Sequence, residues 1–302
     1  MFRGFVCLIF LGLIPAGNAL AALNIVTTTS DLEAIVNAVS GGKAEVSAIA
    51  KGTQDAHQIE AKPSFMVKMR GADLVIAHGL ELETAWIVPL IQGGRNPKIS
   101  VGTKGYLELG DKIDPIEIPK GNVSRAEGDV HPGGNPHFTL DPIRVGDAAV
   151  VIAERMGDLD ASNKALFKKN AETFRQHLKD KSKDWKARLE KTGIKSVVTY
   201  HKTLSYFLNR YDIKNPIQLE PRPGIPPTAA HLLDVIELMK KDGIRLVLIE
   251  NFFDAKAGDK VMQEVPKAKV AVVPVSVGGE PEIKTNEQLI ERIVKIIEEN
   301  SH

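Results

Sequence analysis

Three histidines in this chain could together hold a metal ion: His57, His137 and His201. Neutral imidazole is the commonest nitrogen ligand of zinc in proteins. The three residues lie far apart in the sequence and form no local metal-binding motif, so a site made from them has to be assembled by the fold. For each histidine alone, a hydrogen-bonded place in the core or on the surface is the more common role, and spacing does not decide between the two.

Predicted strands precede two of these histidines. A β-branched run at residues 46–49 comes before the loop that holds His57, and another at residues 196–200 leads directly into His201. Ligands of open parallel sheets bind in the crevice beyond the carboxyl ends of the strands. The sequence therefore places two of the histidines at such a crevice, and also His137 if its segment follows a strand.

Strands and helices alternate along the rest of the chain. Apolar runs predict further strands at residues 23–29, 73–77, 245–249 and 270–274. A closing helix is predicted at residues 286–299, whereas residues 108–136 predict a long surface loop because they are rich in Gly, Pro, Asp and Glu. The alternation indicates α/β lobes with mostly parallel sheets.

A long amphipathic helix is predicted at residues 160–191. Its apolar residues recur along one face: Phe167, Phe174, Leu178, Trp185 and Leu189. About 30 helical residues extend about 45 Å, enough to join two lobes, although a helix inside one domain would show the same pattern. We therefore predict an α/β fold of two lobes, each with a mostly parallel sheet flanked by helices, joined by one long linker helix. The lobes would span residues 22–158 and 193–302, with the linker at 159–192.

Residues 1–21 have the features of a cleaved secretory signal peptide. Arg3 gives a positive start, residues 5–14 are a short apolar run, and Ala19-Leu20-Ala21 is a small-x-small cleavage pattern. A membrane anchor is the alternative, but the run is shorter than the roughly 20 residues that span a bilayer. The mature chain is therefore expected in a Gram-negative periplasm.

Composition limits the chemistry of the mature chain. The only cysteine, Cys7, lies in the signal peptide and is not preceded by a lipoprotein-type sequence, so disulfides and thiolate ligands are excluded. The 39 Lys and Arg residues balance 38 Asp and Glu residues, which gives no reason to expect a nucleic-acid partner. No second segment is apolar enough to embed the chain in a membrane. Any metal ligands are therefore His, Asp, Glu or water.

Several segments resemble signatures of one protein family. Those around His57 (Asp-Ala-His-Gln-Ile-Glu), His137 (Asn-Pro-His-Phe-Thr-Leu-Asp-Pro) and His201 (Val-Thr-Tyr-His-Lys-Thr-Leu) are similar to segments of the zinc- and manganese-binding solute-binding proteins of bacterial ABC importers. Residues 78–83 resemble the family's Asn-Gly-Leu-x-Leu-Glu segment, and residues 220–227 its Glu-Pro-x-x-Gly-x-x-Pro turn. The resemblance covers nearly the whole mature chain.

This resemblance implies a metal site in the cleft between the lobes, with His57 and His137 from the first lobe and His201 from the second. It also implies high-affinity capture of a divalent ion in the periplasm by a monomer with modest lobe motion, and delivery to a membrane permease and its ATPase. Three imidazoles favour Zn2+ over Mn2+, which suits oxygen-rich sites and stays the alternative. Copper or nickel would bind such nitrogens as well.

The fourth ligand is where this sequence departs from the family it resembles. Many relatives place an aspartate in the loop after the last strand, but Ser276 stands near that position here. Glu250, Glu280 or a water molecule could complete the site, and Glu250 could instead hold a ligand imidazole in its tautomer. His131 could contact the metal transiently or be an ordinary loop residue. The remaining histidines before the C-terminus are expected to be structural or exposed: His78, His177 and His231.

A zinc hydrolase is the competing function, because three imidazoles and a water also make a hydrolytic site. Such an enzyme would need a base beside the open position, and Glu250 or Glu280 could serve. The chain has no His-Glu-x-x-His run and no Gly-x-Ser-x-Gly elbow, so we expect no enzymatic activity. A surface adhesin, a role of some lipid-anchored relatives, is disfavoured by the missing lipoprotein signal.

Overall fold

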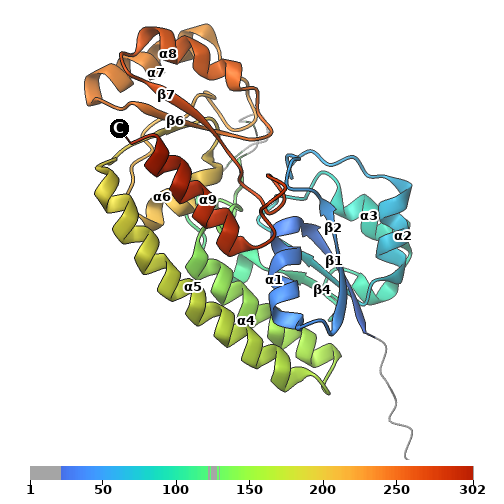
Figure 1. The fold of residues 1–302 in the computed structure, drawn as a ribbon. Coiled ribbons are helices and arrows are strands. Elements are labelled where there is room, and N and C mark those ends of the chain that lie inside the picture. Colours follow the sequence, from blue (N-terminus) through green and yellow to red (C-terminus); the bar gives the residue numbers. More distant parts are fainter. Residues whose placement is uncertain (1–21, 122, 124–127, 129, 302) are drawn as a thin grey trace, which may run out of the picture.

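Figure 1 shows the computed structural model, which describes residues 22–121, 123, 128 and 130–301. Two α/β lobes lie along a long helix. The expected signal peptide at residues 1–21 lies outside the described residues. Within them, no helix is both long enough and apolar enough to cross a membrane.

The first lobe is built on a sheet of four parallel strands in the order β2-β1-β3-β4. In chain order these strands are β1 (Leu23–Thr29), β2 (Ala44–Ala50), β3 (Leu74–Ala77) and β4 (Tyr106–Glu108). The two central strands, β1 and β3, are buried on both faces, which explains why their sequences are continuous apolar or β-branched runs. Because all four strands are parallel, their carboxyl ends lie at one edge of the sheet.

Helices cover both faces of this sheet. They are α1 (Ser30–Ser40), α2 (Pro63–Gly71), α3 (Ile87–Gly94) and α4 (Pro142–Leu159). Successive residues of β1 point to opposite faces, so Ile25 packs in the core with α1 and α4, while Val26 packs in the core with α2 and α3. Among the described residues, the connections contain the 3-10 helices η1 (Pro97–Ile99), η2 (Gly110–Lys112) and η4 (Phe138–Leu140).

The second lobe is a smaller parallel sheet in the order β5-β6-β7. Its elements are β5 (Val198–Thr199), α6 (Ser205–Arg210), α7 (Ala229–Asp242), β6 (Leu246–Glu250), α8 (Asp259–Glu264), β7 (Lys269–Val273) and α9 (Asn286–Glu299), with η5 (Lys202–Leu204) and η6 (Ala255–Gly258) between them. Val247 of β6 faces a core with α7 and α8, whereas Leu248 faces the core that continues to α9 and the first lobe.

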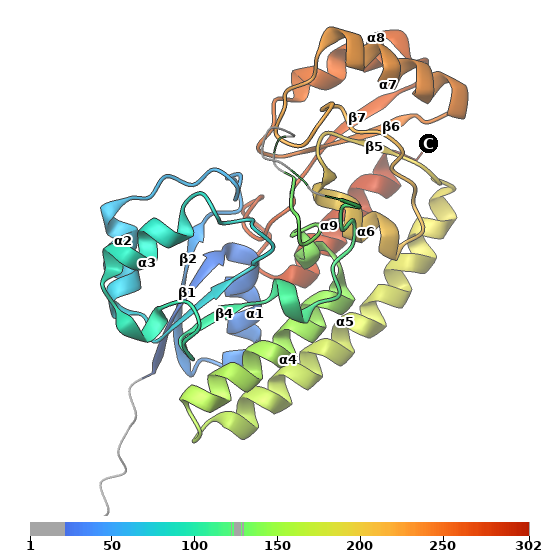
Figure 2. The ribbon, with the colours of Figure 1, turned by 180° about the vertical axis from the view of Figure 1, so that it is seen from behind.

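Helix α5 (Lys164–Thr192) runs along the molecule in Figures 1 and 2. It packs against α4 and α1 in the first lobe and against α9. It begins at Lys164, later than the expected residue 160, because the Asp160 carboxylate accepts hydrogen bonds from Ser162 and Asn163 in a turn after α4. The α/β class with two parallel sheets and a long helix is confirmed.

A second segment connects the lobes, in addition to α5. Residues 275–286 run from β7 back to the first lobe before α9 begins. The Val277 N–H donates a hydrogen bond to Asp31 Oδ1 at 2.8 Å, and the Ser30 hydroxyl donates to the Val277 carbonyl at 2.6 Å. The Asn286 amide donates to the Asp31 carbonyl at 3.3 Å. These bonds fix the loop after the last strand against the start of α1.

Candidate metal centre

The fold brings the three predicted histidines together. One possible ligand atom from each of His57, His137 and His201 lies within 4.8 Å of those of the other two. The ring centroids of these histidines are 5.2 Å apart for His57 and His137, and 5.5 Å for each of the other two pairs. His57 follows β2, His201 follows β5, and His137 directly precedes η4. His57 and His201 thus lie beyond the carboxyl ends of strands from different sheets.

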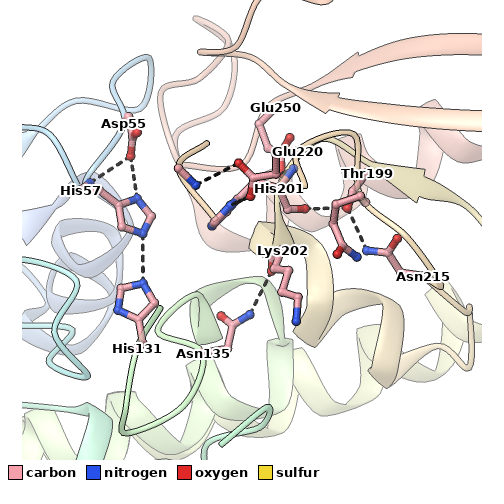
Figure 3. Close-up of polar contacts among 12 residues, drawn as sticks. Asp55, His57, His131, Asn135, Thr199, His201, Lys202, Asn215, Glu220 and Glu250 are labelled. Carbon is pink, nitrogen blue, oxygen red and sulfur yellow. Dashed lines mark hydrogen bonds and ion pairs between the residues drawn. The ribbon is translucent and has the colours of Figure 1, made fainter. Parts of the chain in front are cut away.

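Asp55 fixes the ring of His57. Its Oδ1 accepts hydrogen bonds from the His57 backbone N–H at 2.9 Å and from the ring Nδ1 at 2.7 Å (Figure 3). Burial opposes the charge on Asp55, but the hydrogen bonds and the positive potential of His57 hold its pKa below the usual value. An ionised carboxylate accepting from Nδ1 sets the tautomer in which Nε2 carries the lone pair for a metal.

Glu220 and Glu250 hold His201 from two sides (Figure 3). The Glu220 carboxylate is hydrogen-bonded to His201 Nδ1 and also accepts from the Gly224 N–H at 3.1 Å. Glu250 Oε1 accepts from the His201 backbone N–H at 3.3 Å. The side chains of His201, Glu220 and Glu250 are all buried. Glu220 therefore directs the Nε2 of His201, and Glu250 fixes the backbone that carries the ring.

His137 presents an unsatisfied ring nitrogen to the site. Its Nε2 is buried and has no hydrogen-bond partner, whereas its backbone N–H donates to Asn135 Oδ1 at 2.9 Å. The Asn135 amide donates in turn to the Lys202 carbonyl at 3.0 Å, next to His201 (Figure 3). Burial, and the positive potential of the neighbouring histidines, lower the pKa of His137 well below 6.5. A buried, neutral, unpartnered imidazole nitrogen fits a metal ligand.

Neither candidate carboxylate joins the three histidines. Glu250 binds the His201 backbone, and burial raises the pKa of Glu250 to about 8. Glu280 accepts from Arg292 Nε at 2.9 Å on α9. Ser276 lines a cavity of about 30 Å³ together with Asp31, His57 and His137, and a space of that size admits a water molecule.

Histidines outside this group have other partners. His78 Nε2 is 2.9 Å from the Thr29 hydroxyl, and burial lowers the pKa of His78 to about 4. His177 is exposed on α5, and its Nε2 is 2.8 Å from the Glu287 carboxylate of α9. His231 Nε2 is 2.9 Å from the Gln218 carbonyl. His131 differs from these residues, because its Nε2 lies 3.2 Å from His57 Nε2 (Figure 3).

Sequence reasoning did not identify Asp55 and Glu220 as partners of the imidazoles. Both residues stood inside segments that resemble family signatures, in Asp-Ala-His and in the Glu-Pro turn. Their position in these segments was the sign in the sequence that could have identified them. The distance along the chain between Glu220 and His201 gave no indication of their contact.

Comparison with known proteins places this geometry in context. The manganese ABC transporter substrate-binding lipoprotein scaA of Streptococcus gordonii is 25% identical over 250 residues, which cover 81% of this chain and 76% of that protein. The zinc-binding lipoprotein AdcA of Streptococcus pneumoniae (strain ATCC BAA-255 / R6) is 24% identical over 273 residues, 89% of this chain and 53% of AdcA. The chain therefore spans about half of that zinc-binding relative.

The fold is shared with solved structures. A crystal structure of ZnuA superimposes with a TM-score of 0.79 at 20% identity, covering 93% of this chain and 100% of that one. The profile of the family described as zinc-uptake complex component A, periplasmic (ZnuA), matches residues 25–300, nearly all of the described chain. The chain therefore belongs to the ZnuA family of periplasmic zinc-uptake components.

Proposed function

We propose that this chain captures a divalent transition-metal ion with high affinity and delivers it to an ABC importer, formed by a membrane permease and its ATPase. The single observation that carries this proposal is the convergence of His57, His137 and His201, with possible ligand atoms within 4.8 Å of one another. Asp55 and Glu220 support the proposal, because each binds the Nδ1 of a candidate ligand and leaves Nε2 to coordinate.

The imidazole nitrogens of the three histidines favour zinc. Imidazoles suit zinc, whereas manganese prefers carboxylate, carbonyl and water ligands. Manganese stays the second candidate, because scaA, which aligns over most of the chain, is named as a manganese protein. Copper and nickel also bind imidazole, so the physiological ion has to be identified by competition.

The proposed site lies between the lobes. His57 and His137 come from the unit of residues 22–158 and His201 from the unit of residues 193–302, with residues 159–192 as the linker. Capture would therefore depend on how the lobes are arranged. We propose cleavage after residue 21 and a monomeric periplasmic protein; several relatives are named as lipoproteins, so a lipid anchor is the alternative to test.

Hydrolysis is the weaker candidate function. A hydrolytic zinc needs a base aimed at its bound water. Glu250 binds a backbone N–H and Glu280 binds Arg292, so each of the two carboxylates weighed for that role has another partner. These contacts favour metal binding without turnover.

The proposal is tested by zinc titration and metal analysis of the purified mature chain, with manganese as competitor, on wild type and His201→Ala. The matched control is His177→Ala, which removes an exposed histidine on α5. The expected result is one tightly bound zinc per chain in wild type and the control, and its loss in His201→Ala. Absence of tight zinc in wild type, or binding indifferent to His201, would overturn the proposal.

A further inference from the structure

We propose that His131 supplies a fourth imidazole to the captured ion, so that the site closes as four nitrogen ligands. This inference rests on the proposed metal capture and specifies the ligand that the sequence leaves open. It concerns a residue from the glycine-rich turn before His137, not the loop after the last strand.

The first support is a distance. His131 Nε2 lies 3.2 Å from His57 Nε2. Zinc–imidazole bonds of about 2.0–2.1 Å at tetrahedral angles separate neighbouring ligand nitrogens by about 3.3 Å. The two nitrogens therefore already have the spacing of neighbours around one zinc ion.

The second support is the pattern of ring hydrogen bonds. The Asp55 carboxylate accepts a hydrogen bond from the Nδ1–H of His57. Asp55 thus favours the His57 tautomer in which Nε2 carries the lone pair. In the metal-free protein the Nε2 of His131 lies within hydrogen-bonding distance of that nitrogen, at 3.2 Å. A zinc ion between the two nitrogens would replace that hydrogen bond with two coordinate bonds, with the ring proton of His131 on Nδ1.

The third support is the position of His131 in the cavity. His131, His137 and His201 line one cavity of about 270 Å³, with Asn135 and Lys202 beside them. The ring centroids of His131 and His137 are 6.5 Å apart, longer than the 5.2 Å between His57 and His137. His131 thus stands at the side of the three-histidine group, and closure requires its turn to move inward. Gly133 and Gly134 come after Pro132, and Gly134 has a φ of +107°.

The chemistry of four imidazoles has a consequence for selectivity. An all-nitrogen set favours zinc, and it removes the open position at which a manganese ion would keep oxygen ligands. We therefore expect His131 to raise the preference for zinc over manganese, in addition to raising the affinity for zinc.

The test compares the mature wild-type chain with His131→Ala. The control is His231→Ala, because the Nε2 of His231 lies 2.9 Å from the Gln218 carbonyl in the second lobe. X-ray absorption of the zinc-loaded proteins counts the imidazoles, and titration gives the zinc and manganese affinities. We expect four imidazoles in wild type and three in His131→Ala, with zinc affinity lower by more than about tenfold, the smallest effect usual even for residues that only support a ligand. The zinc-to-manganese affinity ratio should fall as well, and His231→Ala should match wild type.

Three imidazoles in wild-type protein, or unchanged affinity in His131→Ala, would overturn the role of His131. The His201→Ala variant separates this outcome from failure of the metal-capture proposal. If wild type binds zinc tightly and only His201→Ala loses it, the metal-capture proposal is supported and the role of His131 as fourth ligand is refuted. If wild type binds no zinc, both proposals fall. Thermal unfolding of metal-free His131→Ala, expected to match wild type, shows that the variant is folded.

Discussion

The Nδ1 of His201 is hydrogen-bonded to the carboxylate of Glu220, and both side chains are buried. His201 lies just after β5, while Glu220 begins the Glu-Pro turn, and the Gly224 N–H donates to the second carboxylate oxygen at 3.1 Å. The turn therefore holds the carboxylate, and the carboxylate holds the ring. This chain of contacts directs the ring's other nitrogen toward His57 and His137.

Glu220→Gln should lower zinc affinity by about 10- to 100-fold, the usual effect of losing a residue that orients a ligand imidazole. The amide retains an acceptor but lacks the charge that favours the Nδ1–H tautomer. Zinc titration measures the effect. Glu172→Gln on the exposed side of α5, where Glu172 pairs with Arg175 at 2.6 Å, is the control and should bind zinc as wild type does. Equal affinities in all three proteins would show that Glu220 does not orient the ring.

His137 should remain neutral in the metal-free protein at mildly acidic pH. Burial lowers the pKa of His137 well below 6.5 in the folded protein, whereas a histidine in the unfolded chain should have a pKa of about 6.5. Below that pH the unfolded state binds a proton that the native state does not, so this group lowers the free energy of unfolding as pH falls. NMR of the ring should show no titration of His137 between pH 7 and 5.5 in the folded chain. A midpoint near 6.5 in the folded protein would contradict the burial argument.

The sequence predicted those parts of the fold that depend on local periodicity. The buried face of α5 is the predicted stripe with Phe167, Leu178, Trp185 and Leu189. The histidines after β2 and β5 were placed correctly, because parallel strands must present their carboxyl ends at a common edge. β4 was missed because its three residues are too few to establish a pattern, and α3 and α8 lay in stretches that had been given no element.

Two contacts between distant segments, outside the three-histidine group, could not be predicted. The approach of His131 to His57 depends on the path of a loop without periodicity, and the bond between Asp31 and Val277 joins residues from opposite lobes. Such pairs are set by how the lobes pack, and a single sequence carries no signal for that packing. The later start of α5 follows from the side chain of Asp160, whose competition with the helix a hydrophobic stripe does not reveal.

Asp31→Asn should stabilise the protein at pH 7.5, and about half of that advantage should be lost at pH 5. Burial raises the pKa of Asp31 from 3.8 to about 6, so the native state binds more protons than the unfolded state between those values. The stability that this group contributes below its unfolded pKa is therefore lost as pH rises through about 6. Two units correspond to about 3 kcal/mol, and the Asn oxygen can still accept from the Val277 N–H.

Denaturant unfolding of wild type and Asp31→Asn at both pH values measures this difference. Asp234→Asn, on an exposed position of α7, is the control and should show no such dependence. Asp31→Ala should be less stable than Asp31→Asn at both pH values by about 1–3 kcal/mol, because the buried Val277 N–H loses its acceptor. If the gain in stability of Asp31→Asn over wild type grew as the pH fell, this would contradict a raised pKa of Asp31.

Gly52→Ala should weaken both the contact between the lobes and zinc binding. Gly52 lies in the loop that carries His57, and a Cβ there would meet the Val277 carbonyl oxygen at 2.2 Å and Gly278 C at 2.5 Å. Both atoms are backbone, so the loop after β7 has to move. Overpacking of this kind lowers the free energy of unfolding by about 1–3 kcal/mol, and the movement displaces His57 relative to His201. Thermal unfolding and zinc titration should both change.

The matched control is Gly71→Ala at the end of α2, where a Cβ meets only the Asn24 amide at 3.3 Å. Because alanine favours helix, this variant should be at least as stable as wild type and should bind zinc unchanged. Loss of stability in Gly52→Ala with unchanged zinc affinity would separate the packing of the lobes from the geometry of the site. Loss of both in Gly52→Ala alone would show that the close approach of the two loops keeps His57 in reach of His201.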